Sequence, residues 1–520
     1  MLTRRSGILL HPTSLPGPFG IGELGRHAHA WVDTLADAGQ RAWQVMPLGP
    51  TGFGDSPYQC FSAFAGNPYL ISLERLQGEG LLSDDDLAEG HDLPGDRVDY
   101  GRVIAFKLDM LRRAEARFEA GAPPAERAAR DAFTREQADW LDDYAAFMAL
   151  KQAHDGQPWN AWDPALRDRE PGALADALAQ HADEIRRQST WQYWVRRDWM
   201  AVRRHAGERG IAVIGDIPIF VAYDSADTWA QRDAFFLDEQ GAPTVVAGVP
   251  PDYFSDTGQR WGNPLYRWEA MADAGFPWWI RRFRATLDYF DLIRVDHFRG
   301  FEAYWEIPAR EPTAVNGRWV QGPGQPLFDA LRDALGELPI LAEDLGVITP
   351  GVEELRDANG FPGMKVLQFA FAAGASDPYL PHNYPRNCLV YTGTHDNDTT
   401  RGWYAAAPEA ERDHVRRYLG RADHEAPFEL IRAAQASVAD LAVFPLQDAL
   451  GLGSEARMNT PGRAEGNWSW RFAWEQLPAE LVARLRDMAT LYGRTETGAP
   501  RDTPYRQTTT GGGTDEEAKR

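Results

Sequence analysis

Four short apolar segments of this chain each end in a carboxylate. They are 211–216 (IAVIGD), 292–296 (LIRVD), 340–343 (ILAE) and 389–396 (LVYTGTHD), which end in Asp216, Asp296, Glu343 and Asp396. In a parallel β/α barrel, apolar strands fill the core, and the residues at their C-terminal ends face the substrate. Retaining cleavage of a glycosidic bond needs one carboxylic acid and one carboxylate nucleophile. The pattern is therefore typical of a barrel that cleaves sugars.

The residues next to these carboxylates refine the interpretation. In LIRVDH, the two-residue period of a strand places Arg294 and Asp296 on one face. A guanidinium group favours the ionised form of a neighbouring carboxylate, which an attacking nucleophile requires. The alternative is a purely structural Arg–Asp pair. Glu343 and Asp344 must point to opposite faces, and alternation does not say which enters the site. His395, just past a strand, could bind sugar hydroxyls or be an ordinary core histidine.

Composition narrows the class of partner. The 520 residues include 54 Lys and Arg against 76 Asp and Glu, so the net charge of −22 disfavours nucleic acid, anionic membranes and polyanionic substrates. Two cysteines, Cys60 and Cys388, predict no disulfide framework and a reducing cytoplasm. No apolar run reaches the ~20 residues of a membrane span, and the apolar segment near the start, GILL, is too short for a signal peptide. The 19 tryptophans exceed what a core requires, and indole faces suit sugar rings.

Eight segments have the composition of strands, and helical patterns separate several of them. Helical spacing is seen in 28–38 and in Leu327, Leu331 and Leu335. This alternation predicts an α/β fold, a (β/α)₈ TIM barrel. The strand segments are 7–14, 42–48, 211–220, 290–298, 339–346, 364–371, 388–397 and 441–446.

Two long gaps between these strands predict insertions into a catalytic barrel that spans 1–499. The first insertion, about 68–209, has helical periodicity and predicts a helical subdomain. The second, about 222–289, is loop-like and dense in Pro, Gly, Trp and Tyr, which predicts a substrate lid. The polar residues 500–520 form a low-complexity tail that we expect to be disordered.

Six segments together resemble those of a known enzyme family. They are SPYQCFSAFAGNPYL (56–70), GDIPIF, GVPPDYFSDTGQRWGNPLY, IRVDHFRG, LAEDLG and TGTHDNDT, in this order. They look very like the 4-α-glucanotransferases called amylomaltases or disproportionating enzymes, glycoside hydrolase family 77, relatives of the α-amylases. The similarity runs from HPTSLPG near the start to NWSWR at 467–471. It implies a (β/α)₈ barrel with inserted subdomains and no separate C-terminal β domain.

The resemblance also implies roles for individual residues. Asp296 resembles the nucleophile, Glu343 the general acid/base, and Asp396 the carboxylate that holds donor hydroxyls and distorts the ring. Val221 stands where α-amylases carry a histidine, which argues against a true amylase. The implied supporting and substrate-binding residues are Arg294, His395 and Asp216 around the carboxylates, Tyr58 stacked on the donor glucose, Pro251, Asp252, Tyr253, Phe254, Gln259 and Trp261 in a mobile substrate loop, and Asn467 on the acceptor side.

The implied reaction is a double displacement without cofactor or metal. It moves segments of α-1,4-glucans (malto-oligosaccharides, amylose, starch or glycogen) to glucose or another glucan through a covalent glucosyl-enzyme, and it cyclises long glucans. Three alternatives stay open: a hydrolase on the same barrel, distinguished by newly formed reducing ends; an enzyme with Mg²⁺ or Ca²⁺ on Asp296, Glu343 and Asp396, distinguished by chelation; and a non-catalytic glucan-binding protein.

Overall fold

The computed structural model describes residues 3–251, 255–421, 425–463 and 465–495. Eight parallel strands form one sheet in the order β10-β11-β12-β1-β2-β3-β6-β9. The N–H of Ala342 donates to the carbonyl of Pro362 at 2.9 Å, which joins β9 to β10, the two ends of this order. The predicted barrel is confirmed, and each predicted strand segment overlaps one strand. These strands are β1 (Arg5–Leu9), β2 (Ala42–Gln44), β3 (Ala212–Pro218), β6 (Leu292–Asp296), β9 (Ile340–Ala342), β10 (Gly363–Val366), β11 (Cys388–Tyr391) and β12 (Leu441–Pro445).

Alternate residues of the strands fill the barrel interior. Strand alternation then places Asp216 two residues after Ile214, and Arg294 and Asp296 above Leu292, on the same interior face. The polar residues at the C-terminal ends thus continue an apolar column. The buried part of this column is one cluster of Leu9, Ala42, Ile214, Leu341, Met364, Val366, Leu389, Tyr391, Leu441 and Val443, with Leu292 packed against it.

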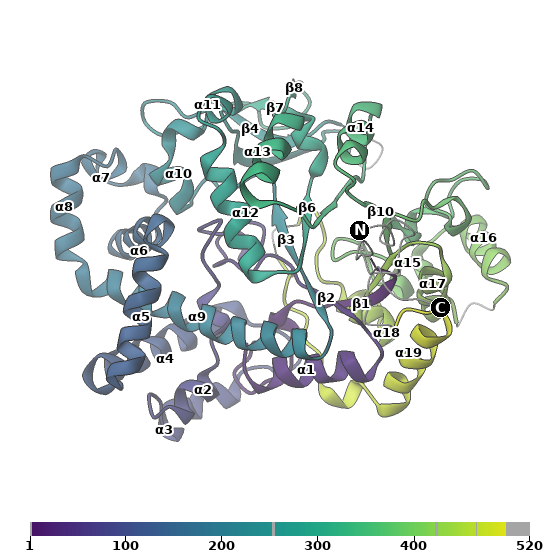
Figure 1. The fold of residues 1–520 in the computed structure, drawn as a ribbon, viewed down its shortest axis with the longest axis horizontal. Helices are drawn as coiled ribbons and strands as arrows, with labels where there is room; N and C mark the ends of the chain where they lie inside the picture. Colours follow the sequence, from purple (N-terminus) through teal and green to yellow (C-terminus); the bar gives the residue numbers. More distant parts are fainter. Residues whose placement is uncertain (1–2, 252–254, 422–424, 464, 496–520) are drawn as a thin grey trace, which may run out of the picture.

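Helices cover the outside of the barrel (Figure 1). In α1 (Arg26–Asp37), Ala28, Trp31, Val32 and Leu35 are buried, and this three- and four-residue spacing makes one apolar stripe that faces the strands. Outside the two predicted insertions, the other helices are α13 (Gln325–Leu335), α14 (Pro350–Ala358), α15 (Thr400–Ala406), α16 (Glu409–Leu419), α17 (Ala426–Ala436), α18 (Leu446–Ala449) and α19 (Ala479–Leu491).

A group of helices occupies the chain between β2 and β3, on one side of the barrel in Figure 1. The longest, α9 (Ala182–Glu208), connects this group to the barrel. Its Trp191 and Trp194 pack in a cluster with α4, whereas Trp199 and Val202 join the cluster outside the strands. The others are α2 (Leu73–Gly78), α3 (Asp84–Leu87), α4 (Tyr100–Gly121), α5 (Pro124–Glu136), α6 (Ala138–Ala153), α7 (Pro164–Arg167) and α8 (Pro171–Gln180).

The segment that the sequence describes as loop-like, 222–289, contains more regular structure than expected. It carries α10 (Ala226–Ala230), β4 (Val245–Val249), β5 (Gln259–Pro264), α11 (Trp268–Asp273) and α12 (Pro277–Tyr289). An antiparallel sheet, in the order β5-β4-β7-β8, combines β4 and β5 with β7 (Ala303–Pro308) and β8 (Arg318–Gln321). The pairing of β4 with β7 is not visible in the sequence, because β6 separates them along the chain.

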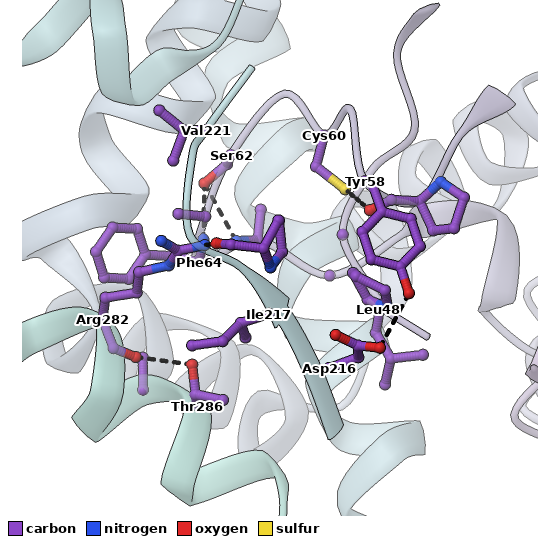
Figure 2. Close-up of a pocket in the computed structure, with 18 of the residues that line it drawn as sticks. Leu48, Tyr58, Cys60, Ser62, Phe64, Asp216, Ile217, Val221, Arg282 and Thr286 are labelled. Carbon is purple, nitrogen blue, oxygen red and sulfur yellow. Dashed lines mark hydrogen bonds between the residues drawn. The ribbon is translucent and has the colours of Figure 1, made fainter. Parts of the chain in front are cut away.

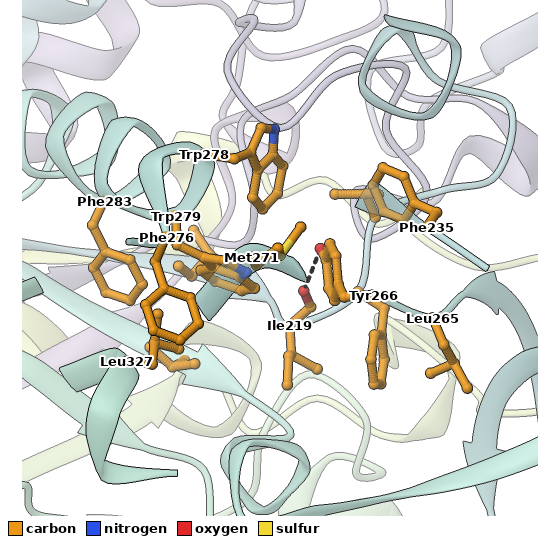
Figure 3. Packing of buried hydrophobic residues seen from close by; sticks show 14 of the residues in the cluster. Ile219, Phe235, Leu265, Tyr266, Met271, Phe276, Trp278, Trp279, Phe283 and Leu327 are labelled. Atoms are coloured by element: carbon orange, nitrogen blue, oxygen red, sulfur yellow. Dashed lines mark hydrogen bonds between the residues drawn. The ribbon is translucent and has the colours of Figure 1, made fainter. Parts of the chain in front are cut away.

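Aromatic residues anchor this segment to the barrel. Tyr266 donates its hydroxyl to the carbonyl of Ile219, just after β3, at 2.9 Å (Figure 3). Its ring lies 5.5 Å from that of Trp279 and 5.1 Å from that of Phe235. Trp229, Trp268, Trp278 and Trp279 of this segment are buried and are therefore core residues.

The described chain ends just after α19, and within the described ranges no strand follows β12. The predicted tail, 500–520, lies outside the described residues. No helix in the described part combines the length and the apolar character needed to cross a membrane.

Candidate active site

Arg294 joins two of the strand-end carboxylates. Its Nη1 donates to Oδ2 of Asp216 at 2.6 Å, and its Nη2 lies 2.9 Å from Oδ1 of Asp296. The side chains of Arg294 and Asp216 are 4% and 0% exposed, whereas that of Asp296 is 30% exposed. Arg294 therefore has one buried structural partner and one partner that reaches the open end of the barrel. The buried partner Asp216 has the surroundings of a structural ion pair, and the role of Asp296 stays a prediction.

Tyr58 covers this pair from the segment after β2. Its hydroxyl donates to Oδ2 of Asp216 at 2.9 Å (Figure 2). Burial raises the pKa of Tyr58 well above its usual value, and the nearby Asp216 adds to the effect. The phenol therefore stays protonated and acts as a donor to Asp216.

Glu343 lies next to Asp296 and is held by the backbone. Its Oε2 accepts the N–H of His297 at 2.7 Å, and its Oε1 accepts the N–H of Leu345 at 2.9 Å. Burial, followed by repulsion from Asp296, raises the pKa of Glu343 to about 8, against the opposing influence of Arg294. A carboxylic acid that keeps its proton at neutral pH is suited to general acid catalysis.

Asp344 points away from this site. It forms an ion pair with Arg356 of α14, and its Oδ1 accepts the N–H of Met364 at 2.6 Å. Glu343, two residues after the interior Leu341, is therefore the member of the pair that faces Asp296. The choice that alternation leaves open is made by the partners of Asp344.

Asp396 is placed by a segment that the sequence interpretation missed. Asn459 Nδ2 donates to Oδ1 of Asp396 at 2.6 Å, and Arg457 Nη2 donates to the carbonyl of Asp396 at 2.6 Å. His395 Nε2 lies 3.4 Å from Oδ1 of Asp396. Asn459 and Arg457 follow η11 (Ser454–Ala456) and end no strand, so no strand-end signal marks them.

Aromatic rings flank Asp396. The ring of Tyr58 stacks on that of His395, with centroids 5.1 Å apart and planes at 15°. Trp468 lies 5.8 Å from Tyr58 and 5.9 Å from His395. Its φ of 61° is in the left-handed region, which costs energy for a residue with a side chain and is common at functional sites. Trp468 was missed, although it lies within NWSWR.

Asn467, expected on the acceptor side, uses its amide within a turn. Its Oδ1 accepts the N–H of Thr460 at 2.9 Å, and its Nδ2 donates to the carbonyl of Arg463 at 2.8 Å. In this structure the Asn467 side chain thus links Thr460 and Arg463, which follow Asn459.

The expected substrate loop is the connection between β4 and β5. Gln259 and Trp261 lie on β5 itself. The indole of Trp261 meets the ring of His297 edge to face, with centroids 4.8 Å apart, and its Nε1 donates to Oε1 of Gln259 at 3.1 Å. Trp261 thus lies beside the residue that follows Asp296. Pro251 is exposed, and Asp252, Tyr253 and Phe254 lie outside the described residues.

Tyr58 and Asp216 also line a cavity of about 690 Å³, including its open part (Figure 2). It is bounded by the 57–66 segment, β3 and α12, and Asp296 and Glu343 do not line it. It is therefore separate from the two carboxylates expected to do chemistry. Among the described residues, no three His, Cys, Asp or Glu side chains are grouped as a metal site.

Comparison with known proteins decides the family. The model of glycoside hydrolase family 77, described as 4-alpha-glucanotransferase, matches residues 10–476. The chain belongs to this family. The 4-alpha-glucanotransferase of Thermus thermophilus is 56% identical over 496 residues, which cover 94% of this chain and 98% of that protein. The chloroplastic/amyloplastic enzyme of Solanum tuberosum is 45% identical, over 94% of this chain and 86% of that protein.

Solved structures agree with this assignment. An amylomaltase from Streptococcus agalactiae, in complex with acarbose, superposes with a TM-score of 0.92 at 38% identity, over 94% of this chain and 99% of that chain. An amylomaltase from Corynebacterium glutamicum has a TM-score of 0.78 at 19% identity, over 95% and 75% of the two chains, and supports the fold alone.

Family membership makes the chain a glycosyl-transferring enzyme, a 4-alpha-glucanotransferase that acts on α-glucans. It favours this class over the hydrolase, the metal-dependent enzyme and the glucan-binding protein that the carboxylates alone left open. The roles of individual residues stay predictions.

Proposed function

We propose that this 4-alpha-glucanotransferase works with retention, with Asp296 as nucleophile and Glu343 as acid/base. The observation that carries the proposal is the contrast between the two carboxyl groups. Asp296 is partly exposed and forms an ion pair with Arg294. Glu343 is held by two backbone N–H groups, and its pKa is raised to about 8 by burial and by Asp296. A retaining mechanism needs one carboxyl group of each kind.

The reaction then proceeds in two steps. Asp296 attacks the anomeric carbon of the donor, the glycosidic C–O bond breaks, and the leaving oxygen takes the proton of Glu343. The glucan is now bonded to Asp296. In the second step Glu343, now a carboxylate, removes a proton from the 4-hydroxyl of an acceptor glucan, and that oxygen displaces Asp296. Two inversions restore the α-1,4 linkage.

We assign the other predicted residues to binding. Asp396, oriented by Asn459, would accept hydrogen bonds from donor hydroxyls and distort the ring, and Tyr58 would face the donor. Trp261 would offer its indole to the acceptor. The acceptor is glucose or another glucan, and a long donor whose own end serves as acceptor gives a cyclic glucan. Acarbose, bound in the S. agalactiae amylomaltase, supports an α-glucan donor site here.

Incubation with maltotriose alone tests this function. Transfer should give glucose together with chains longer than three units, while the number of reducing ends stays constant. A steady rise in reducing ends would instead show hydrolysis. For retention, a 5-fluoro-α-glycosyl fluoride should leave a covalent adduct on the peptide that contains Asp296, detected by mass spectrometry. An adduct on another residue would overturn the nucleophile assignment.

A further inference from the structure

We propose that Arg299 is a positioning residue for the acid/base Glu343, acting through the 345–347 segment. The proposal rests on the function proposed above. Arg299 lies in η7 (Phe298–Phe301), directly after β6, and is 5% exposed. It contacts neither Asp296 nor Glu343 through any described hydrogen bond or ion pair.

Three consecutive residues after Asp296 donate to the segment that contains Glu343. The N–H of His297 donates to Oε2 of Glu343 at 2.7 Å, and the N–H of Phe298 donates to the carbonyl of Glu343 at 3.1 Å. The guanidinium Nη1 of Arg299 donates to the carbonyl of Val347. Of these three donors, only Arg299 uses its side chain.

The hydrogen bond from Arg299 to Val347 affects the position of the Glu343 carboxyl group. Val347 lies two residues after Leu345, whose N–H donates to Oε1 of Glu343 at 2.9 Å. Val347 itself is 54% exposed, so its side chain has little packing to hold the segment. Leu345 packs against the apolar barrel interior, so the Val347 end of the segment is the part that depends on the Arg299 hydrogen bond. Without Arg299 this end would be loosened, and the Leu345 N–H would hold the Glu343 carboxyl group less rigidly.

The fixed position of Arg299 comes from the antiparallel sheet. Its guanidinium carbon lies 3.7 Å from the ring centroid of Trp319 on β8. Trp319 is 40% exposed and meets Trp305 of β7 edge to face, with centroids 5.2 Å apart. A flat guanidinium stacks on such a ring and still donates in its plane, which an ammonium group cannot do. The sheet that the sequence did not predict thus reaches the catalytic acid through this stack.

Two donor substrates, of which only one needs a proton from Glu343, distinguish a role of Arg299 in positioning Glu343 from an effect on protein stability. With maltotriose, the leaving sugar oxygen must take a proton from Glu343. With α-maltosyl fluoride, Asp296 attacks, the C–F bond breaks and fluoride leaves with the electron pair, so no proton is needed. We would measure transfer from maltotriose and first-turnover fluoride release for Arg299→Met, Arg299→Lys and Trp319→Leu.

We expect Arg299→Met to lower transfer from maltotriose by roughly 10- to 100-fold, and fluoride release by about threefold or less. Arg299→Lys should recover part of the loss, because lysine can still donate to Val347. Trp319→Leu should shift both rates in the same direction as Arg299→Met but less. Arg318→Met is the matched control, because it removes the arginine next to Trp319 on β8. Arg318 is 75% exposed and paired with Glu306, so this variant should leave both rates near wild type.

Equal losses on both donors would show a merely structural role and overturn the proposal. If Arg299→Met does not fold, Trp319→Leu makes the same test with the arginine in place. Glu343→Ala keeps this result separate from the proposed function. It must lose transfer from maltotriose and keep fluoride release; if it loses both, the acid assignment itself fails. If Glu343→Ala keeps fluoride release but the Arg299 and Trp319 variants lose both rates equally, the positioning role alone is refuted.

Discussion

At the scale of single residues, the adjacent carboxylates Glu343 and Asp344 have opposite surroundings. Glu343 faces Asp296 inside the barrel, and Asp344 pairs with Arg356 outside it. We expect Asp296→Ala and Glu343→Gln each to lower transfer by several orders of magnitude while the protein stays folded. Asp344→Asn should keep activity within about tenfold but lose on the order of 3 kcal/mol of stability, because it breaks a buried pair. Rates on maltotriose and thermal melts check both, and the reverse ranking in activity would contradict the assignment of the two faces.

The environment of Glu343 also predicts a pH dependence of stability. Its pKa is raised from 4.5 to about 8, chiefly by burial, so the folded protein keeps a proton that the unfolded chain has lost. This contribution is present in full below the unfolded pKa and disappears as the pH rises through the folded pKa. The Tm of Glu343→Gln should therefore rise relative to wild type between about pH 5 and about pH 9. Exposed Glu353→Gln on α14 is the control, and a constant Tm difference for Glu343→Gln would refute the coupling.

At the scale of elements, strand β5 brings Trp261 beside His297, the residue that follows β6. If its indole holds the acceptor, Trp261→Ala should reduce transfer more than hydrolysis, because water needs no aromatic platform. The share of free glucose among the products should then rise several-fold while total turnover falls. Arg260→Ala is the matched control, since this neighbour donates to the carbonyl of Ala309 instead. An unchanged ratio in a normally stable Trp261→Ala protein would mean that the indole only packs strand β5.

At the scale of the whole molecule, Arg494 near the end of the described chain connects α17 and β1 at the barrel face opposite the carboxylates. Arg494 is fully buried, and its guanidinium donates to the carbonyl of Gln435 at 2.7 Å and to that of Arg5, at the start of β1, at 2.9 Å. We expect these contacts to contribute to stability rather than to chemistry, because the substrate side of such a barrel is its C-terminal face.

Two changes near this end of the chain, a truncation and a substitution, have different expected outcomes. Removal of the residues after Gly498 should leave Tm and activity unchanged, because the polar composition of that tail cannot offset the entropy of ordering. Arg494→Met should lower stability by on the order of 3 kcal/mol, since several buried carbonyls lose their donor, while kcat stays the same. Thermal melts and transfer assays of the truncated protein and of Arg494→Met check these two predictions. A large drop in Tm after truncation would show that the tail packs on the barrel.

The sequence by itself determined the barrel and the strand-end carboxylates, because both follow from the two-residue period of strands and from the residues that end them. That information is local. Tertiary structure alone decided that Glu343 rather than Asp344 faces the site, through Arg356 and Met364. It also paired β4 with β7, brought Asn459 and Trp468 to the site, and joined Arg299 to Val347 and Trp319. These contacts join segments that are far apart in the chain, and no local pattern records which distant partner a side chain meets.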